Sequence, residues 1–181
     1  MKLLPIAFAA VTALCAFTTQ AQNAANLNAA LASESRAQAD READARRKPA
    51  ETLDFFGIGP GMMVVDLIAS GGYYTEVLAN AVGPRGKVYM QNAPSALEGE
   101  RGARTEEAIN TRLAGGRLAN VERLNRDASD LGLPANSLDA AVIALEYHEL
   151  FRSADPDAEM KFLNEMKRVL KSGGILGVID H

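Results

Sequence analysis

The chain has 181 residues, of which 48% are hydrophobic and 23% charged, and its formal net charge is −4. This composition is typical of an ordinary globular protein and excludes a disordered chain, a collagen and a disulfide-stapled miniprotein. Because 19 basic residues stand against 23 acidic ones, the sequence offers no strongly basic surface for nucleic acid.

The first 21 residues have the pattern of a secretory signal peptide. Lys2 supplies a positive start, residues 3–17 form an apolar run, and Thr19-Gln20-Ala21 offers small residues at a cleavage site. The apolar run falls short of the roughly 20 residues that a membrane-spanning helix needs. We therefore expect a periplasmic or secreted protein without stable membrane insertion once the leader is removed. Cys15 is removed with the leader, which excludes disulfides and cysteine metal sites from the mature chain.

Residues 22–48 are rich in Ala, Asn, Gln and both signs of charge, with few large apolar groups besides Leu27 and Leu31. Such a segment predicts one or two solvated helices, or partly flexible chain, leading to Pro49. Its charges are expected to form an exposed helical face held by local pairs. These charged residues are Arg36, Asp40, Arg41, Asp44 and Arg46.

From Pro49 onward, apolar strand patterns alternate with helical ones. Met62–Ile68 is too continuously apolar for a one-sided sheet and predicts a central parallel strand. Helical spacing follows over Tyr73–Val82 and stops at Gly83-Pro84, the usual order of a glycine cap and a proline. Lys87–Gln91 predicts the second strand.

The second half of the chain continues this alternation. A weakly amphipathic helix is predicted over Ala96–Leu113. Asp155 is expected to cap a further helix that has Pro156 at its first position and ends near Lys171–Gly174. The remaining predicted strands are Val121–Asn125, Leu138–Leu145 and Ile175–Ile179.

Strands that alternate with helices predict an α/β fold, an open and mostly parallel Rossmann-like sheet of about five strands with helices on both faces. In such sheets the ligand lies over the carboxyl ends of the central strands. Three candidate segments fall there: the loop after Asp66, the turn Gln91-Asn92, and Glu146–Glu149.

Three further segments are more specific than these periodic patterns. They are Leu163–Leu176, Pro60–Leu67 and Asp127–Asp139. Together they resemble the class I S-adenosylmethionine-dependent methyltransferases, and more narrowly the exported members of that family in Gram-negative bacteria. The first looks like the helix and turn before the fifth strand, the second like the lead into the first motif, and the third like the stretch before the fourth strand. The resemblance runs from Arg46 to the end of the chain, and we predict that residues 49–181 form the methyltransferase-like domain.

The resemblance implies S-adenosylmethionine as the cofactor. Asp66 would hold its methionine end, and Gly71 and Gly72 would let the backbone approach it without a Cβ in the way. The family commonly has a GxGxG pattern, whose first two glycines correspond to Ile68 and Ser70 here. The structural alternatives are a helix-capping aspartate and a tight turn between strand and helix.

Other contacts with the cofactor follow from the same resemblance. An acid at the end of the second strand normally meets the ribose, and Gln91 and Asn92 stand there instead, as amides that can still hydrogen-bond a diol. Tyr73 and Tyr74 would wall the sulfonium, whose charge an aromatic face attracts, unless they serve only packing. The predicted cofactor-binding residues are Asp66, Ser70, Gly71, Gly72, Tyr74, Gln91, Asn92, Asp127, Ala128 and Glu146, with Asp127 accepting from the adenine amino group.

Methyl transfer needs positioning, a dry pocket and a base where the acceptor must lose a proton. His148 is the predicted base because histidine titrates near neutrality and this one follows the fourth strand, with Glu149 as second choice. The structural alternative is a histidine that hydrogen-bonds at a helix start. His148 and His181 lack a third ligand, so no metal site is predicted.

The predicted function is S-adenosylmethionine-dependent methyl transfer to a small-molecule acceptor. An exported non-catalytic binding module with a degenerate methyltransferase fold is the alternative, favoured by Ile68, Ser70 and Asn92. A nicotinamide-binding Rossmann domain fits less well, because GxGxxG and its following acid are missing. The last two strands of the family fold are missing after His181, which indicates a C-terminally truncated sequence, or else an exposed Ile175–Ile179 edge that pairs copies into a homo-oligomer.

Overall fold

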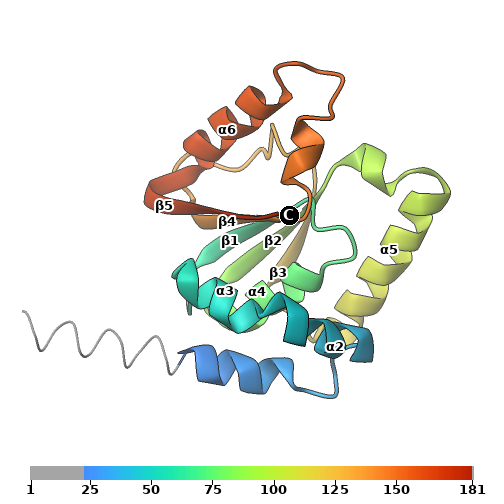
Figure 1. The fold of residues 1–181 in the computed structure, drawn as a ribbon, viewed down its shortest axis with the longest axis vertical. Coiled ribbons are helices and arrows are strands. Elements are labelled where there is room, and N and C mark those ends of the chain that lie inside the picture. The colour runs from blue at the N-terminus through green and yellow to red at the C-terminus, as the bar shows by residue number, and fades with distance from the viewer. Residues whose placement is uncertain (1–22, 181) are drawn as a thin grey trace, which may run out of the picture. The chain divides into compact units, whose positions relative to one another are not determined.

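The computed structural model describes residues 23–180. The predicted signal peptide, residues 1–21, lies outside the described residues, as does His181. Contacts divide the chain between Gly59 and Pro60 into two compact units, each described by itself below (Figure 1). Within residues 23–180, no helix combines the length and the apolar character that crossing a membrane requires.

The first unit is built from helices. Residues 23–31 are helical, and α2 (Gln38–Arg47) and α3 (Pro49–Phe55) follow. Pro49 occupies the first position of α3, where its missing N–H leaves no helical hydrogen bond unmade. The contacts group α3 with the N-terminal helices, so this division falls later than the predicted domain start at Pro49.

Arg36 departs from the expected exposed charged face of this unit. Its side chain is 1% exposed, its Nη1 lies 2.5 Å from Asp44 Oδ2, and the same nitrogen donates to the carbonyl of Leu31 at 2.7 Å. The prediction of a solvated position is therefore wrong for Arg36. Its guanidinium closes the turn between two helices, a contact across eight residues that helical spacing does not reveal.

The second unit is an open sheet of five parallel strands in the order β3-β2-β1-β4-β5 (Figure 1). The predicted α/β fold with an open parallel sheet is confirmed. The strands are β1 (Met63–Leu67), β2 (Lys87–Asn92), β3 (Val121–Asn125), β4 (Leu138–Ala144) and β5 (Leu170–Ile179). The helices are α4 (Tyr73–Val82), α5 (Gly99–Leu113) and α6 (Ala158–Val169), with short 3₁₀ turns η1 (Pro94–Leu97), η2 (Ala114–Gly116) and η3 (Tyr147–Leu150).

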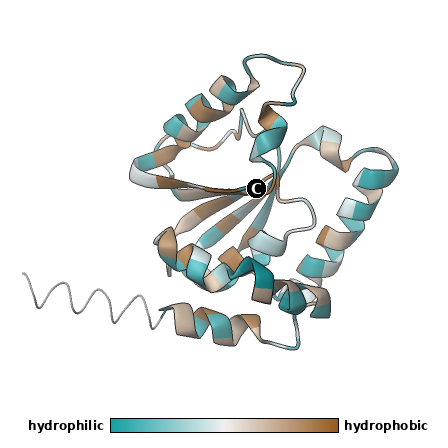
Figure 2. Cartoon of the chain, viewed as in Figure 1, coloured by the Kyte–Doolittle hydropathy of each residue, from teal (hydrophilic) through white to brown (hydrophobic). Residues whose placement is uncertain are grey.

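Helices α4 and α6 cover opposite faces of the sheet, as Figure 1 shows. Side chains alternate along β1, so Val65 and Leu67 enter the core cluster that contains Phe162 and Met166 of α6. Val64 and Asp66 point to the other face, where Asp66 meets α4. In Figure 2 the central strands β1 and β4 are mostly brown, as expected of strands that are buried on both faces.

Two details of the last crossover differ from the sequence prediction. Helix α6 begins at Ala158 with Asp157 at its N-cap, so the predicted cap at Asp155 is wrong. The Asp155 carboxylate instead accepts the Asp157 N–H at 3.0 Å and pairs with Lys161 at 2.6 Å, which makes a separate turn before the helix. Strand β5 begins at Leu170, which pairs with Leu138 of β4, and the pairing resumes at Ile175 after a bulge.

Candidate functional site

The strand order determines where side chains can gather. β1 lies between β2 and β4, so the chain leaves β1 toward one side of the sheet and returns to β4 on the other. The carboxyl ends of neighbouring strands in such a sheet flank a crevice that holds ligands. The structure therefore brings the loop 68–72, the end of β2 and the turn η3 to the same edge, as predicted.

The loop after β1 keeps an unusual backbone. Ile68 and Ser70 both have φ of 50°, and Gly72 has φ of 85°. Only glycine adopts this left-handed region without steric cost, and a β-branched residue there is a marked outlier. The three residues are the glycine positions of the GxGxG pattern, so the chain retains the glycine-type backbone although two positions carry side chains.

Gln91 and Asn92 hold this backbone in place from the end of β2. Gln91 Oε1 accepts the Ile68 N–H at 2.8 Å, and its Nε2 donates to the carbonyl of Arg126 at 2.6 Å. Asn92 Oδ1 accepts the Ser70 N–H at 2.8 Å, and its Nδ2 donates to the Ser70 carbonyl at 3.3 Å. Both side chains are buried, with relative exposures of 0% and 2% for the residues. Their predicted contact with a ribose stays a prediction, and their present role is to support the loop.

Gly71 and Gly72 pack against the protein. A Cβ on Gly72 would lie 2.7 Å from Met90 Cε, and one on Gly71 would lie 3.3 Å from the Ala108 Cβ. Arg112 of α5 donates from Nε to the Gly71 carbonyl at 2.7 Å. The two glycines therefore allow close packing of the loop against β2 and α5, and any cofactor contact would come from their backbone.

A buried ion cluster lies behind the same loop. The Glu76 carboxylate is fully buried on the first turn of α4 and pairs with both Arg112 and Arg117. Burial opposes ionisation of Glu76, but the hydrogen bond from Arg117 and the charges of both guanidiniums outweigh it, so the pKa of Glu76 is lowered. This cluster ties α4, α5 and the loop together.

Asp66 is a buried carboxyl on β1. Its Oδ2 accepts the Thr75 hydroxyl at 2.5 Å, and the residue is 2% exposed. Burial raises the pKa of Asp66 to about 7, although Thr75 and Arg112 pull the pKa down. Asp66 is thus poised to change charge near neutrality.

The aromatic and adenine-side predictions lie around this loop. The rings of Tyr73 and Tyr74 meet edge to face with centroids 5.1 Å apart, and Tyr74 is buried. In the loop after β3, Asp127 is exposed, while Ala128 packs against the core cluster under α6. Asp127 is therefore available to a ligand, whereas Ala128 anchors its loop.

The ends of β4 and β5 carry the titratable groups. Leu145 follows β4 with φ of 64°, a strained conformation for leucine, and its N–H donates to the Ile179 carbonyl at 2.7 Å. Glu146 precedes η3 and is half-buried, and burial raises its pKa, with the Glu149 carboxylate as the next cause. Glu149 itself is exposed and pairs with Arg152 at 2.9 Å.

His148 lies between two carboxylates. Its Nδ1 is 3.0 Å from Asp180 Oδ1, its backbone N–H donates to Asp180 Oδ2 at 2.9 Å, and its Nε2 is 3.1 Å from Glu149 Oε1. The hydrogen bond with Asp180, followed by the negative charges of Asp180 and Glu149, raises the pKa of His148. The predicted pair His148 and Glu149 is thus in contact. Asp180 was not among the predicted site residues.

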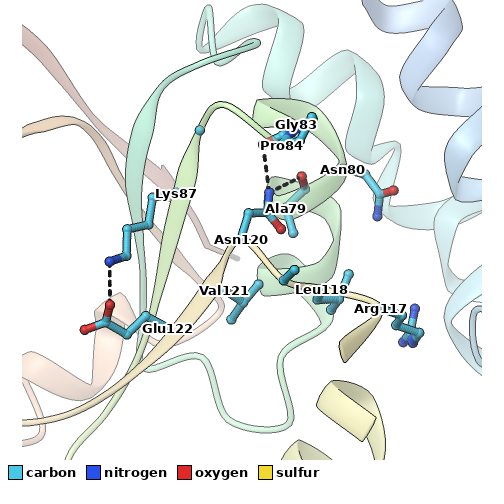
Figure 3. A pocket seen from close by; sticks show the side chains of 12 residues that line it. Ala79, Asn80, Gly83, Pro84, Lys87, Arg117, Leu118, Asn120, Val121 and Glu122 are labelled. Atoms are coloured by element: carbon cyan, nitrogen blue, oxygen red, sulfur yellow. Dashed lines mark hydrogen bonds and ion pairs between the residues drawn. The ribbon is translucent and has the colours of Figure 1, made fainter. Parts of the chain in front are cut away.

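A separate hollow of about 750 Å³ lies at the opposite, amino edge of the sheet (Figure 3). Asn120 Nδ2 donates to the carbonyls of Ala79 at 2.8 Å and Gly83 at 3.0 Å, and Lys87 pairs with Glu122 at 2.5 Å. No predicted site residue lines this hollow. Within residues 23–180, no group of three or more His, Cys, Asp or Glu side chains is placed to hold a metal ion.

Residues 56–178 match a family model described as a methyltransferase domain. The chain belongs to the methyltransferase domain family. The predicted resemblance to the class I S-adenosylmethionine-dependent methyltransferases is thereby confirmed at the level of the family.

Individual relatives agree with this assignment. The chain is 29% identical over 130 residues to the "Ubiquinone/menaquinone biosynthesis C-methyltransferase UbiE" of Ectopseudomonas mendocina, covering 71% of this chain and 45% of that one. It is 30% identical over 129 residues to the protein of the same name from Hahella chejuensis, covering 71% and 47%. The chain therefore spans about half the length of the curated relatives it matches.

Solved structures support the same fold. A SAM-dependent methyltransferase from Aquifex aeolicus superimposes with a TM-score of 0.59 and 32% identity, covering 73% of this chain and 63% of that one. The YcgJ protein from Bacillus subtilis has a TM-score of 0.57 at 18% identity, covering 75% and 51%, which shows a shared fold alone.

The residues present fit the cofactor of the family, S-adenosylmethionine. Ile68, Ser70 and Gly72 all adopt the left-handed backbone that glycine favours, so the side chains at the first two positions leave the loop on a glycine-like path. The carboxyls of Asp66 and Glu146 suit a ligand that carries positive charge. Sequence reasoning missed Thr75, Arg112 and Asp180, which act on predicted residues from distant positions. Only Thr75 has a sequence signal, since it lies in the first turn of the helix after Asp66.

Proposed function

We propose that this chain binds S-adenosylmethionine over the carboxyl ends of β1 and β2 and transfers its methyl group to a small molecule held beside β4 and β5. The observation that supports this most strongly is the left-handed backbone at Ile68, Ser70 and Gly72. Strained non-glycine residues persist only where the surroundings enforce them, and here Gln91 and Asn92 do so.

The proposed roles divide between the two halves of the edge. The backbone of the loop 68–72 and the Asp66 carboxyl would hold the methionine part, and Tyr73 would lie near the sulfonium. When bound, S-adenosylmethionine supplies an electrophilic methyl group on a positively charged sulfur. His148 would take up the proton that the acceptor loses, with Glu149 and Asp180 stabilising the charged imidazolium.

The acceptor proposed here is a small aromatic ring with an ionisable hydroxyl group. The curated relatives are named as C-methyltransferases of ubiquinone and menaquinone biosynthesis. Loss of a hydroxyl proton makes the neighbouring ring carbon more nucleophilic, which gives a base such as His148 a purpose. The probe is the unmethylated ring precursor of menaquinone with a short side chain, reduced to the quinol, and the product measured is S-adenosylhomocysteine.

Calorimetric titration tests the cofactor directly. We expect S-adenosylmethionine and S-adenosylhomocysteine to bind the 181-residue chain, and Gly72→Val to weaken this binding because its Cβ would displace Met90 Cε, 2.7 Å away, and crowd the Arg112 side chain at 3.1 Å. Gly57→Val is the matched control, since it also lies at positive φ but has open space around its Cβ position. Absence of binding at millimolar ligand would refute the proposed function.

We also propose that residues 1–21 act as a signal peptide and direct the protein to the periplasm or the medium. The support is the charged start, the apolar run and the small residues up to Ala21. Fractionation of expressing cells and sequencing of the mature N-terminus test this. A mature chain that begins at Gln22 outside the cytoplasm is expected, and an uncleaved cytoplasmic chain would contradict it.

A further inference from the structure

Asp180 and His148 meet because β4 and β5 are neighbouring parallel strands. Ala144 pairs with Ile179, and the Leu145 N–H extends the pairing to the Ile179 carbonyl. Asp180 follows directly after β5, while His148 stands in η3 after β4. The contact therefore rests on the sheet itself and depends on residues 32 positions apart in sequence.

The Asp180 carboxylate binds His148 at two points. Oδ2 accepts the backbone N–H of His148 at 2.9 Å, which fixes the direction of the carboxylate. Oδ1 then faces Nδ1 of the ring at 3.0 Å. The Asp180 side chain is 18% exposed and the His148 side chain 36%, so solvent reaches the ring more easily than its carboxylate partner.

This geometry selects one form of the neutral imidazole. An ionised carboxylate can only accept hydrogen bonds, so a ring nitrogen that is hydrogen-bonded to it must carry the hydrogen, and Nδ1 makes this hydrogen bond with Asp180. With the hydrogen on Nδ1, the lone pair of the neutral ring lies on Nε2. The nitrogen opposite Asp180 is therefore the one able to take up a proton.

Other charged groups near the ring act on its charge and leave this selection intact. Glu149 lies 3.1 Å from Nε2, and its Oε1 also accepts from Arg152 at 2.9 Å. The Glu149 contact is an ion pair that attracts the charged ring, whereas Asp180 also makes a hydrogen bond to Nδ1 and has the larger effect on the ring. Glu146 is the third carboxylate that interacts with His148. The charge of His148 affects Glu146 less than the charge of Glu149 does.

We propose that Asp180 is a positioning residue that keeps neutral His148 in the form with hydrogen on Nδ1, so that Nε2 accepts the proton of the methyl acceptor. This inference rests on the proposed function for its purpose, but the form of the ring can be measured without any acceptor. One proton leaves the acceptor for each methyl group that it gains, and Nε2 holds that proton until it passes to solvent.

Nitrogen-15 NMR of the histidine rings is the test. The full chain contains two histidines, and His148→Gln identifies the signals of His148 by their loss. Above the pKa of His148, we expect the wild-type ring to show a protonated Nδ1 and an unprotonated Nε2. In Asp180→Asn, the amide oxygen can keep the backbone N–H while the amide nitrogen donates to Nδ1. The two ring nitrogens should then exchange their states, and the titration midpoint should move to lower pH.

Glu149→Gln is the matched control because it removes the other carboxylate that touches the ring. It should leave the hydrogen on Nδ1. A wild-type ring with its hydrogen on Nε2, or an Asp180→Asn ring unchanged in form and midpoint, would overturn the proposal. If Asp180→Asn does not fold, the wild-type spectrum still tests the proposal, because it shows which ring nitrogen carries the hydrogen.

Titration of S-adenosylmethionine into the same samples separates this proposal from the proposed function. Binding together with hydrogen on Nε2 would overturn the role of Asp180 alone. The expected ring form without binding would overturn the proposed function, and the proton-accepting role of His148 with it.

Discussion

The two halves of the carboxyl edge of the sheet use their polar side chains in different ways. At the ends of β1 and β2, the amides of Gln91 and Asn92 are buried and bind the backbone of the loop 68–72. At the ends of β4 and β5, the side chains of His148, Glu149 and Asp180 bind one another and remain partly exposed. The first half fixes the shape of a loop, whereas the second can exchange protons with its surroundings.

This difference matches the division of labour that methyl transfer requires. The cofactor must be held in one position, because displacement at a methyl group depends on alignment. An acceptor that must lose a proton needs a neighbouring base whose protonation changes near neutral pH. The following variants test each half separately.

The largest effect is expected for His148→Ala in the exposed half. Turnover of the quinol probe should fall by roughly 100- to 10,000-fold, the usual contribution of a general base. The affinity for S-adenosylmethionine should stay within a factor of about two, because His148 lies outside the loop 68–72. Initial rates of S-adenosylhomocysteine formation and calorimetry measure the two quantities. Unchanged turnover would remove His148 from the mechanism.

Asp66→Asn should alter the pH dependence of stability in the buried half. Burial raises the pKa of Asp66 to about 7, so the folded protein keeps a proton that the unfolded chain loses from about pH 4 upward. The contribution of Asp66 therefore lowers the stability of the wild type relative to the uncharged variant as the pH rises from about 4 to about 7. In urea unfolding, the free energy of unfolding of the variant relative to that of the wild type should rise by up to about 4 kcal/mol between pH 4 and pH 8. Above about pH 7, where Asp66 of the wild type is ionised, the cofactor affinity of the variant should be lower because the carboxylate charge is absent.

Asp139→Asn provides a control of opposite sign. Burial disfavours the Asp139 carboxylate, but hydrogen bonds from Lys171 and from the Met63 N–H outweigh it and lower the pKa. This group stabilises the folded state above the unfolded pKa of about 4 and loses that contribution as the pH falls. The free energy of unfolding of Asp139→Asn should therefore decrease relative to that of the wild type as the pH rises. Equal behaviour of the two variants would contradict the assignment of Asp66 as a buried, raised-pKa group.

Gln91→Leu tests the support of the loop. It leaves the Ile68 N–H and the Arg126 carbonyl without their side-chain partner. A buried group without a hydrogen bond costs about 1–3 kcal/mol, so the free energy of unfolding should fall by a similar amount. Asn125 is exposed and lies opposite Asn92 in the register of β2 and β3, so Asn125→Leu should change the stability little. Equal losses in the two variants would show that Gln91 does not support the loop.

The smallest effect is expected for Ser70→Gly. Ser70 has φ of 50° and is exposed, so glycine relieves backbone strain without removing packing. The gain in unfolding free energy should be about 1 kcal/mol or less, since glycine also increases the entropy of the unfolded chain. Ser70→Ala keeps the Cβ and should gain nothing. A gain for alanine equal to that for glycine would show that the backbone here is not strained.

Local patterns predicted the elements of the second unit well. Continuous apolar runs identified β1 and β4, and helical spacing bounded by Gly83 gave Tyr73–Val82, the observed limits of α4. The start of α6 was misplaced because an aspartate before a proline suits a cap, yet the Asp155 side chain makes its own turn. Signals within a few residues thus located elements but did not settle every boundary.

The sequence predicted where in the fold the site lies, but not which distant residues contact the site residues. The ends of β1, β2 and β4 were expected to meet, and they do. The partners that give the residues their properties come from far along the chain, as Asp180 does for His148 and Arg112 does for Gly71. No spacing rule connects residues 32 or 41 positions apart, because one contact depends on the pairing of β4 with β5 and the other on the packing of α5 against the loop.

The support of the loop by Gln91 and Asn92 has a consequence for hydrogen exchange. The amides of Ile68 and Ser70 donate to buried side-chain oxygens, and the Ala69 N–H donates to the Gln91 carbonyl at 2.9 Å. Three successive loop amides can therefore exchange with solvent only when the end of β2 opens as well. The loop should show the slow exchange of a core strand, and it should lose that protection together with β2 in a single cooperative step.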